Sequence, residues 1–311
     1  MPNPPRQKAS DFDPEVLRLF DQYVHGLIDR RRFLSGAARF AVGATTAAGL
    51  LAALSPQFAA AQQVKPDDKR LSAKYLEFAS PKGYGKARGY LARPVKAKGL
   101  LPLVLVVHEN RGLNPHIEDI TRRLALDGYI AFAPDALFPL GGYPGDEDKA
   151  RAEFARLDQA KTREDFLAAA GVLANLEGGN GRMGVVGFCY GGAMANRLAT
   201  AMPGLAAAVP FYGSAPQLDD VGAIKAELLL HFASDDERVN ASWPAYEAAL
   251  KAARVRYTAH VYPETQHGFH NDTTPRYDED AAKLAWRRTI EFFGRTLRSE
   301  RAPDPREEKY S

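Results

Sequence analysis

The segment Met183–Asn196 constrains the fold of this chain more than any other stretch. It reads Met-Gly-Val-Val-Gly-Phe-Cys-Tyr-Gly-Gly-Ala-Met-Ala-Asn, which predicts a short buried strand, a sharp turn and a helix of small residues. Cys189, the only cysteine of the chain, lies at the apex of the turn. A nucleophile raised on such a turn has a strained backbone, so the residues two positions away on either side must lack a Cβ atom. Gly187 and Gly191 meet this requirement.

The same turn directs the N-terminus of the following helix, and the backbone N–H of Tyr190, at the space above the sulfur of Cys189. Both would stabilise a thiolate or an oxyanion there. A single cysteine in an apolar run is otherwise a small buried hydrophobic residue, and glycine-rich turns without chemistry are common. The local pattern therefore leaves a catalytic and a structural role equally open, and the rest of the chain decides between them.

Apolar, β-branched runs on both sides of this segment predict further strands. Leu101–His108 and Tyr129–Pro134 are almost continuously apolar, as strands buried on both faces of a parallel sheet are. Strand and helix patterns alternate along the chain, which predicts a single α/β domain with a doubly wound, mostly parallel sheet and helices on both faces. The other expected strands are Tyr75–Ser80, Arg88–Arg93, Ala206–Tyr212, Glu227–Phe232 and Arg256–Tyr262, and the expected helices are Pro115–Asp127, Asp146–Leu176, Trp243–Ala253 and Asp278–Leu297.

Length and charge limit the possible functions. The 311 residues suffice for one domain of about 230–250 residues with extensions. The formal net charge is +3, and residues 1–61 hold seven Lys or Arg and five Asp or Glu, so the remainder is close to neutral. A near-neutral domain argues against nucleic acid as a partner. A single cysteine excludes an internal disulfide.

Residues 1–61 combine the three features of an export signal. Arg30–Leu34 resembles the twin-arginine motif, Phe40–Leu54 is an uncharged run of small and apolar residues, and an Ala-x-Ala site predicts cleavage after Ala61. We therefore expect a periplasmic protein that contacts the twin-arginine export machinery transiently. No stable membrane insertion is expected, because the run is shorter than the ~20 residues of a membrane span; anchoring by an uncleaved signal is the alternative. The expected division is a signal at 1–61, a linker at 62–70, the α/β domain at 71–297 and a charged tail at 298–311.

Candidate acid and base residues follow two later strands. In a doubly wound sheet, reactive groups gather at the carboxyl ends of the strands. Asp235 and Asp236 follow one predicted strand, and His267 follows the next. The order of cysteine, aspartate and histidine is that of nucleophile, acid and base in α/β-hydrolases. The imidazole would take the thiol proton, and the carboxylate would fix the tautomer and stabilise the imidazolium.

Two of these assignments have rivals. Asp236 is preferred to Asp235 because it begins an Asp-x-x-Val pattern that returns the valine to the core, whereas Asp235 suits a turn. His270 lies three positions after His267. His108, at a strand end, is expected to be structural. Neither a carboxylate–histidine helix for a metal nor a phosphate-binding glycine loop is present in the sequence, so we predict no metal and no cofactor.

The loop His108–Gly112 follows the buried strand that supplies the second oxyanion donor in such folds. The backbone N–H of Asn110 is the candidate donor. Glu109 is expected beside the thiol, where it would hold the proton of the sulfur in the resting enzyme. The alternative for Glu109 is a surface salt bridge with Arg111.

Four motifs together resemble the dienelactone hydrolase family, the carboxymethylenebutenolidases. They are Gly-Phe-Cys-Tyr-Gly-Gly, the Glu109 loop, the Asp-x-x-Val loop and Gln-His-Gly-Phe, and the resemblance covers Leu71–Leu297. It implies a single α/β-hydrolase domain that opens a lactone or cleaves a small carboxylic ester through a thioester acyl-enzyme. The implied triad is Cys189, Asp236 and His267, with Glu109 as the neighbour of the thiol.

The substrate is less closely indicated. Family members that act on dienelactone hold its carboxylate with arginines, one of them soon after the catalytic histidine. Here His270-Asn271-Asp272 carries no arginine or lysine at that place. Arg151 and Phe269 are the candidate substrate-binding residues. The natural substrate and the oligomeric state stay open, as do two other functions: a non-catalytic binding protein of this fold, and a thioesterase or peptidase with the same triad.

Overall fold

The computed structural model describes residues 7–42 and 45–298. The described residues form one eight-stranded sheet with the order β1-β2-β4-β3-β5-β6-β7-β8. β1 and β2 pair antiparallel, β2 pairs antiparallel with β4, and the strands from β4 to β8 are parallel to their neighbours. This sheet confirms the predicted α/β fold. The strands are β1 (Leu71–Ser80), β2 (Gly85–Pro94), β3 (Leu101–Val107), β4 (Ile130–Pro134), β5 (Gly179–Phe188), β6 (Ala207–Phe211), β7 (Glu227–Asp235) and β8 (Tyr257–Gln266).

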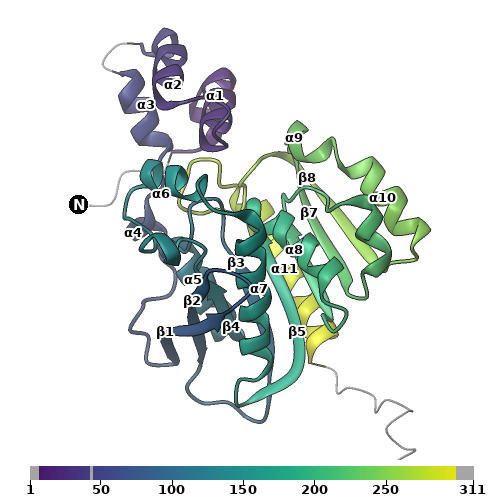
Figure 1. Ribbon diagram of the computed structural model, residues 1–311. Helices are drawn as coiled ribbons and strands as arrows, with labels where there is room; N and C mark the ends of the chain where they lie inside the picture. The colour runs from purple at the N-terminus through teal and green to yellow at the C-terminus, as the bar shows by residue number, and fades with distance from the viewer. Residues whose placement is uncertain (1–6, 43–44, 299–311) are drawn as a thin grey trace, which may run out of the picture.

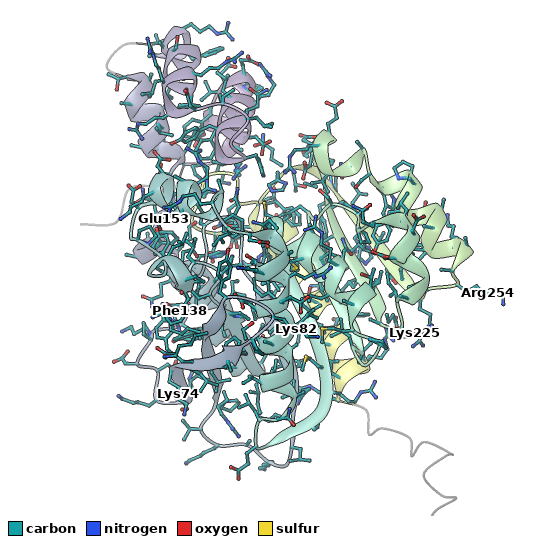
Figure 2. The ribbon with its side chains drawn as sticks, viewed as in Figure 1. Lys74, Lys82, Phe138, Glu153, Lys225 and Arg254 are labelled. Atoms are coloured by element: carbon teal, nitrogen blue, oxygen red, sulfur yellow. The ribbon has the colours of Figure 1, made fainter. Side chains whose placement is uncertain are left out.

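Helices cover both faces of the sheet (Figure 1). One face packs against α5 (Pro115–Leu126) and α11 (Glu279–Leu297), and the other against α7 (Gln159–Ala174), α8 (Tyr190–Ala201) and α10 (Trp243–Ala252). Every residue of β3 is buried, as its continuous apolar sequence predicts. Charged side chains such as Lys74, Lys225 and Arg254 lie on the outside of the molecule (Figure 2).

One predicted helix is two helices in the structure. The stretch predicted as a single helix from Asp146 to Leu176 is divided into α6 (Glu147–Phe154) and α7. The carboxylate of Asp158 accepts hydrogen bonds from the backbone N–H groups of Ala160 and Lys161, and so caps a new helix. An N-terminal cap supplied within an otherwise helical sequence starts a second helix because it satisfies the free N–H groups of the first turn.

Three helices at the start of the chain lie together beyond one end of the sheet, apart from the helices that cover its faces (Figure 1). They are α1 (Pro14–Val24), α2 (Arg30–Ala37) and α3 (Ala47–Leu54). We call residues 7–42 and 45–56 the N-terminal cap. The cap has a hydrophobic core of its own, in which Phe20, Tyr23 and Phe33 are in contact. These residues therefore form a small helical unit with a core separate from that of the α/β domain.

The cap is tied to the α/β domain by the short α4 (Phe58–Ala61) and the segment that follows. The backbone N–H of Gln57 donates to the carbonyl of Thr273, and the N–H groups of Gln63 and Val64 donate to the carboxylate of Asp119. None of the helices in the described residues combines the length and the hydropathy that crossing a bilayer requires. The predicted charged tail lies almost entirely outside the described residues.

Candidate active site

The turn between β5 and α8 carries Cys189 in a backbone conformation that is rare for residues with a side chain. Its φ is 58° and its ψ is −113°. A Cβ atom on Gly187 would lie 1.9 Å from the carbonyl oxygen of Gly191, and one on Gly191 would lie 2.1 Å from the carbonyl oxygen of Val107. Backbone atoms cannot move aside, so both positions require glycine. The sulfur is consequently held at a fixed place above the edge of the sheet.

An aspartate–histidine pair faces this sulfur. Nδ1 of His267, after β8, lies 2.6 Å from Oδ2 of Asp236, after β7, and both side chains are buried. A side-chain nitrogen of His267 lies within 4.8 Å of the sulfur of Cys189. Asp235 is exposed and accepts a hydrogen bond from Ser234 instead. The structure thus brings Cys189, Asp236 and His267 together and leaves Asp235 outside.

The electrostatics of the pair favour charge separation. Burial disfavours the thiolate, but the neighbouring imidazoles of His267 and His25 outweigh this and lower the pKa of the Cys189 thiol to about 5. Burial also disfavours an imidazolium at His267, yet the sulfur of Cys189 and the carboxylate of Asp236 raise its pKa to about 10. At neutral pH the site therefore holds a thiolate beside an imidazolium, the form in which a cysteine attacks carbonyl carbon.

Two other histidines are structural. His270 is buried against the rings of Phe188 and Trp286, and burial lowers its pKa to about 3. Nε2 of His108 accepts a hydrogen bond from the backbone N–H of Ala136, while its Nδ1 donates to the carbonyl of Glu109 at 2.6 Å. His108 thus holds the loop after β3 in place, in agreement with its expected role.

A cavity of about 340 Å³ opens beside the sulfur. Glu109 and Asn110 line it together with Cys189 and His267, and Tyr190 is the first residue of α8. The predicted oxyanion donors are therefore on the two segments that flank the sulfur.

Glu109 accepts a hydrogen bond from the side-chain amide of Asn271 at 3.0 Å. The alternative of a salt bridge with Arg111 is less favoured, because Arg111 pairs with Glu147 at 3.3 Å.

The sequence profile of the dienelactone hydrolase family matches residues 87–297. The chain belongs to the dienelactone hydrolase family. A "putative carboxymethylenebutenolidase" from Salmonella typhi is 34% identical over 219 residues, which are 66% of this chain and 81% of the relative. A "putative hydrolase fragment YghX" from Escherichia coli K12 is 54% identical over 106 residues, 34% of this chain and 91% of the relative.

A solved structure of a "putative dienelactone hydrolase" from Klebsiella pneumoniae superposes with a TM-score of 0.64 at 31% identity, covering 72% of this chain and 99% of its own. Membership of the dienelactone hydrolase family confirms the predicted enzyme class, a carboxylic ester hydrolase similar to carboxymethylenebutenolidases. A second profile, described as YqhI-like, matches residues 3–42. That range includes α1 and α2 of the N-terminal cap.

The two candidate substrate-binding residues of this dienelactone hydrolase family member have other partners. The guanidinium of Arg151 donates to the carbonyl of Tyr23, lies 4.0 Å from the centre of its ring and is 3.6 Å from the carboxylate of Asp148. Phe269 is fully buried and packs on Tyr262 with ring centres 4.9 Å apart. Arg151 thus holds the cap, and Phe269 belongs to the core, because it is fully buried among the apolar residues of the sheet and does not line the cavity.

His25, which follows α1, is a site residue that no sequence motif indicated. Nε2 of His25 lies 3.6 Å from the sulfur of Cys189 and 3.3 Å from Nε2 of His267. Its sequence context, a helix end before Gly26, carries no catalytic motif. Within the described part of the chain, His25, Cys189 and His267 are the group whose donor atoms are close enough to share a metal ion. An ion bound by all three would occupy both the nucleophile and the base.

Proposed function

We propose that this protein is a cysteine-dependent hydrolase that opens a lactone or cleaves a small carboxylic ester through a thioester acyl-enzyme. The observation that carries the proposal is the position of Cys189, at a strained turn and beside the buried Asp236–His267 pair. This is the arrangement of nucleophile, base and orienting acid that covalent acyl transfer requires.

The proposed reaction has two halves. The thiolate of Cys189 attacks the acyl carbon, and the backbone N–H groups of Asn110 and Tyr190 stabilise the resulting oxyanion. The imidazolium of His267 donates its proton to the leaving oxygen as the carbon–oxygen bond breaks. A water molecule, deprotonated by the now neutral His267, attacks the thioester; the carbon–sulfur bond breaks, the acid is released, and the thiolate of Cys189 is restored beside the protonated His267. Asp236 keeps the imidazole oriented throughout, and Glu109 remains the predicted neighbour of the thiol.

The size and lining of the cavity favour small substrates. A volume of about 340 Å³ lies at the lower end of the range for small-molecule pockets. Its walls combine apolar rings such as Phe20 and Phe58 with charged groups such as Glu109 and Arg276. We therefore expect short acyl groups to be accepted and long-chain esters to be refused.

The test is hydrolysis of short aryl esters and of a lactone by the full chain, beside Cys189→Ala and Cys189→Ser. We expect Cys189→Ala to lose activity by about a thousandfold, because no nucleophile replaces the thiol. Mass spectrometry of the rapidly quenched enzyme should show an acyl adduct on the peptide that contains Cys189. Full activity in both variants would exclude the thiol mechanism and require a different nucleophile.

Two further comparisons separate the alternatives. A panel of esters, thioesters and amides distinguishes an esterase from a thioesterase or a peptidase with the same triad. Absence of turnover on the whole panel, with a ligand bound in the cavity, would favour a non-catalytic binding protein.

Export to the periplasm stays a prediction from the motif Arg30–Leu34. Cell fractionation of the full chain, beside a variant with Arg30→Lys and Arg31→Lys, tests it. Retention of the variant in the cytoplasm together with export of the unaltered chain is the expected result. Equal distribution of the two would count against a twin-arginine signal.

A further inference from the structure

The last turn of α1 docks into a group of arginines on the α/β domain. The arginines come from four separate parts of the chain, and two of them donate to carbonyl groups at the C-terminal end of the helix. Cations are stabilised at that end by the helix dipole. The contacts are Arg111 to the carbonyl of Val24 at 3.2 Å, Arg151 to the carbonyl of Tyr23, Arg238 to Nε2 of His25 at 2.9 Å, and Arg276 to the carboxylate of Asp21 at 3.3 Å.

This docking places a second carboxylate–imidazole pair at the thiol. Nδ1 of His25 is 2.8 Å from the carbonyl oxygen of Asp21 and 3.2 Å from its carboxylate, so that nitrogen carries a proton. Nε2 is thereby turned toward the sulfur of Cys189 and toward Nε2 of His267. His267 is held in the same way by Asp236 on its own Nδ1. Two oriented imidazoles therefore face one sulfur from opposite parts of the chain.

We propose that His25 is a further catalytic residue, whose Nε2 shares with Nε2 of His267 the proton that Cys189 gives up. The inference rests on the proposed function. The S–H bond breaks with both of its electrons left on the sulfur, and an N–H bond forms on one of the two imidazoles. When the thiolate attack expels the leaving oxygen, that proton passes to the oxygen. The N-terminal cap is thus part of the catalytic centre, so the proposal requires that the chain stays uncleaved after Ala61.

The groups around His25 support this role. Burial opposes a charge on His25, but Asp21 and the sulfur of Cys189 together raise its pKa. The cations that face it are Arg238 and, when protonated, His267, and both oppose a second positive charge. These charges therefore favour a state in which the two imidazoles share one proton over a state in which each imidazole carries its own.

The first measurement is the rate at which iodoacetamide alkylates Cys189 as a function of pH, in the full chain and in His25→Ala and His25→Gln. This rate follows the thiolate and does not depend on hydrolysis. With one imidazole fewer beside the sulfur, we expect alkylation near pH 5.5 to slow by about threefold in both variants, as the thiol titrates about one pKa unit higher. His260→Gln, which alters a histidine of β8 that does not line the cavity, is the matched control and should alkylate like the unaltered protein.

The second measurement is ester hydrolysis by the same proteins. We expect kcat to fall by about 100-fold in His25→Ala and His25→Gln, with a smaller change in KM, since neither side chain transfers a proton. Added imidazole should restore part of the kcat of His25→Ala, because it can enter the space that the side chain leaves. A merely structural role would give no rescue, and unfolding is checked by the melting temperature of each variant.

Other outcomes overturn the proposal. Alkylation and hydrolysis unchanged in His25→Gln would show that His25 takes no part in the chemistry. Faster hydrolysis in His25→Ala would show that the cap covers the thiol and must be displaced. Loss of hydrolysis in His25→Ala while Cys189→Ala stays active would instead refute the thiol mechanism itself, so the two failures are distinguishable.

Discussion

Oδ2 of Asp236 accepts a hydrogen bond from Nδ1 of His267 at 2.6 Å, while the preceding aspartate, Asp235, points to solvent. The difference arises where β7 ends. Asp236 is the N-cap of α9 (Glu237–Asn240), and its carboxylate also accepts a hydrogen bond from the backbone N–H of Val239, which is buried. The return of Val239 to the core therefore fixes which aspartate faces the histidine.

Asp236→Asn is expected to reduce kcat by about 100-fold or more. The amide cannot stabilise the imidazolium of His267 and can donate to Nδ1, which selects the wrong tautomer. Steady-state hydrolysis of a short aryl ester measures the effect. Asp235→Asn is the control and should keep full activity, because its side chain is exposed and hydrogen-bonds to Ser234 rather than to His267. Equal losses in the two variants would contradict the assignment.

Gly191→Ala is expected to destabilise the fold by about 3 kcal/mol or more, because the new Cβ would lie 2.1 Å from the carbonyl oxygen of Val107. Gly171→Ala is the control, for which a change of stability in the opposite direction is expected. Gly171 lies in α7 with open space around it, so the alanine should stabilise the protein by about 0.5 to 1 kcal/mol. Urea unfolding of both variants checks the sign of each change. A stable, folded Gly191→Ala protein would show that the turn tolerates a side chain.

The pH dependence of thiol reactivity follows from the lowered pKa of Cys189. The thiolate forms as the pH rises through about 5, so alkylation should be half-maximal near pH 5 and constant from pH 7 upward. An isolated cysteine would instead become reactive above about pH 8. His267→Gln should move the midpoint upward, since it removes the largest charge that favours the thiolate. A midpoint near pH 8 in the unaltered protein would contradict the thiolate–imidazolium pair.

Asp272 is expected to contribute to stability above about pH 4. Burial disfavours its ionised form, but His116 at 3.3 Å and Arg123 at 2.6 Å hold its pKa well below the usual range. Because the folded-state pKa is depressed, this stabilisation is present above the unfolded-state pKa and is lost as the pH falls. Asp272→Asn should therefore cost about 3 kcal/mol at pH 7 and roughly 1 kcal/mol less at pH 3, where the unfolded chain has begun to bind the proton but the folded protein has not. Thermal unfolding at both pH values measures the difference; an equal cost at both would refute the ionic contribution.

Arg151→Ala is expected to loosen the N-terminal cap. The substitution removes a hydrogen bond to Tyr23 and the stacking on its ring, so backbone amide exchange in α1 should accelerate by about tenfold. The KM values for an anionic and a neutral ester should change alike. A selective rise in KM for the anionic ester would show that Arg151 binds a substrate carboxylate, the role first suggested by its sequence.

The α/β domain could be read from the sequence because its strands are apolar on both faces and leave few alternative arrangements. The loops that follow β5, β7 and β8 lie at one edge of such a sheet. The sequence alone therefore predicted that Cys189, Asp236 and His267 lie close together. The division between α6 and α7 was missed because neither glycine nor proline marks it. Its signal is a single capping residue, Asp158.

His25 escaped prediction for a different reason. Its partners, Cys189 and His267, lie 164 and 242 positions along the chain, and nothing local to α1 indicates them. The neighbouring arginines and alanines favoured an export signal, an interpretation that treats the segment as separable from the enzyme. A residue whose role depends only on tertiary contacts leaves neither a periodic pattern nor a motif in the sequence.

The contact between Arg276 and Asp21 joins residues 255 positions apart. During synthesis the ribosome releases α1 first, but the surface that receives it is complete only when β8 and the loop carrying Arg276 have emerged. The cap can build its own core earlier, but it cannot dock until the loop that carries Arg276 has been made. Until that loop has emerged, a nascent chain cannot complete the contacts that hold His25 against Cys189.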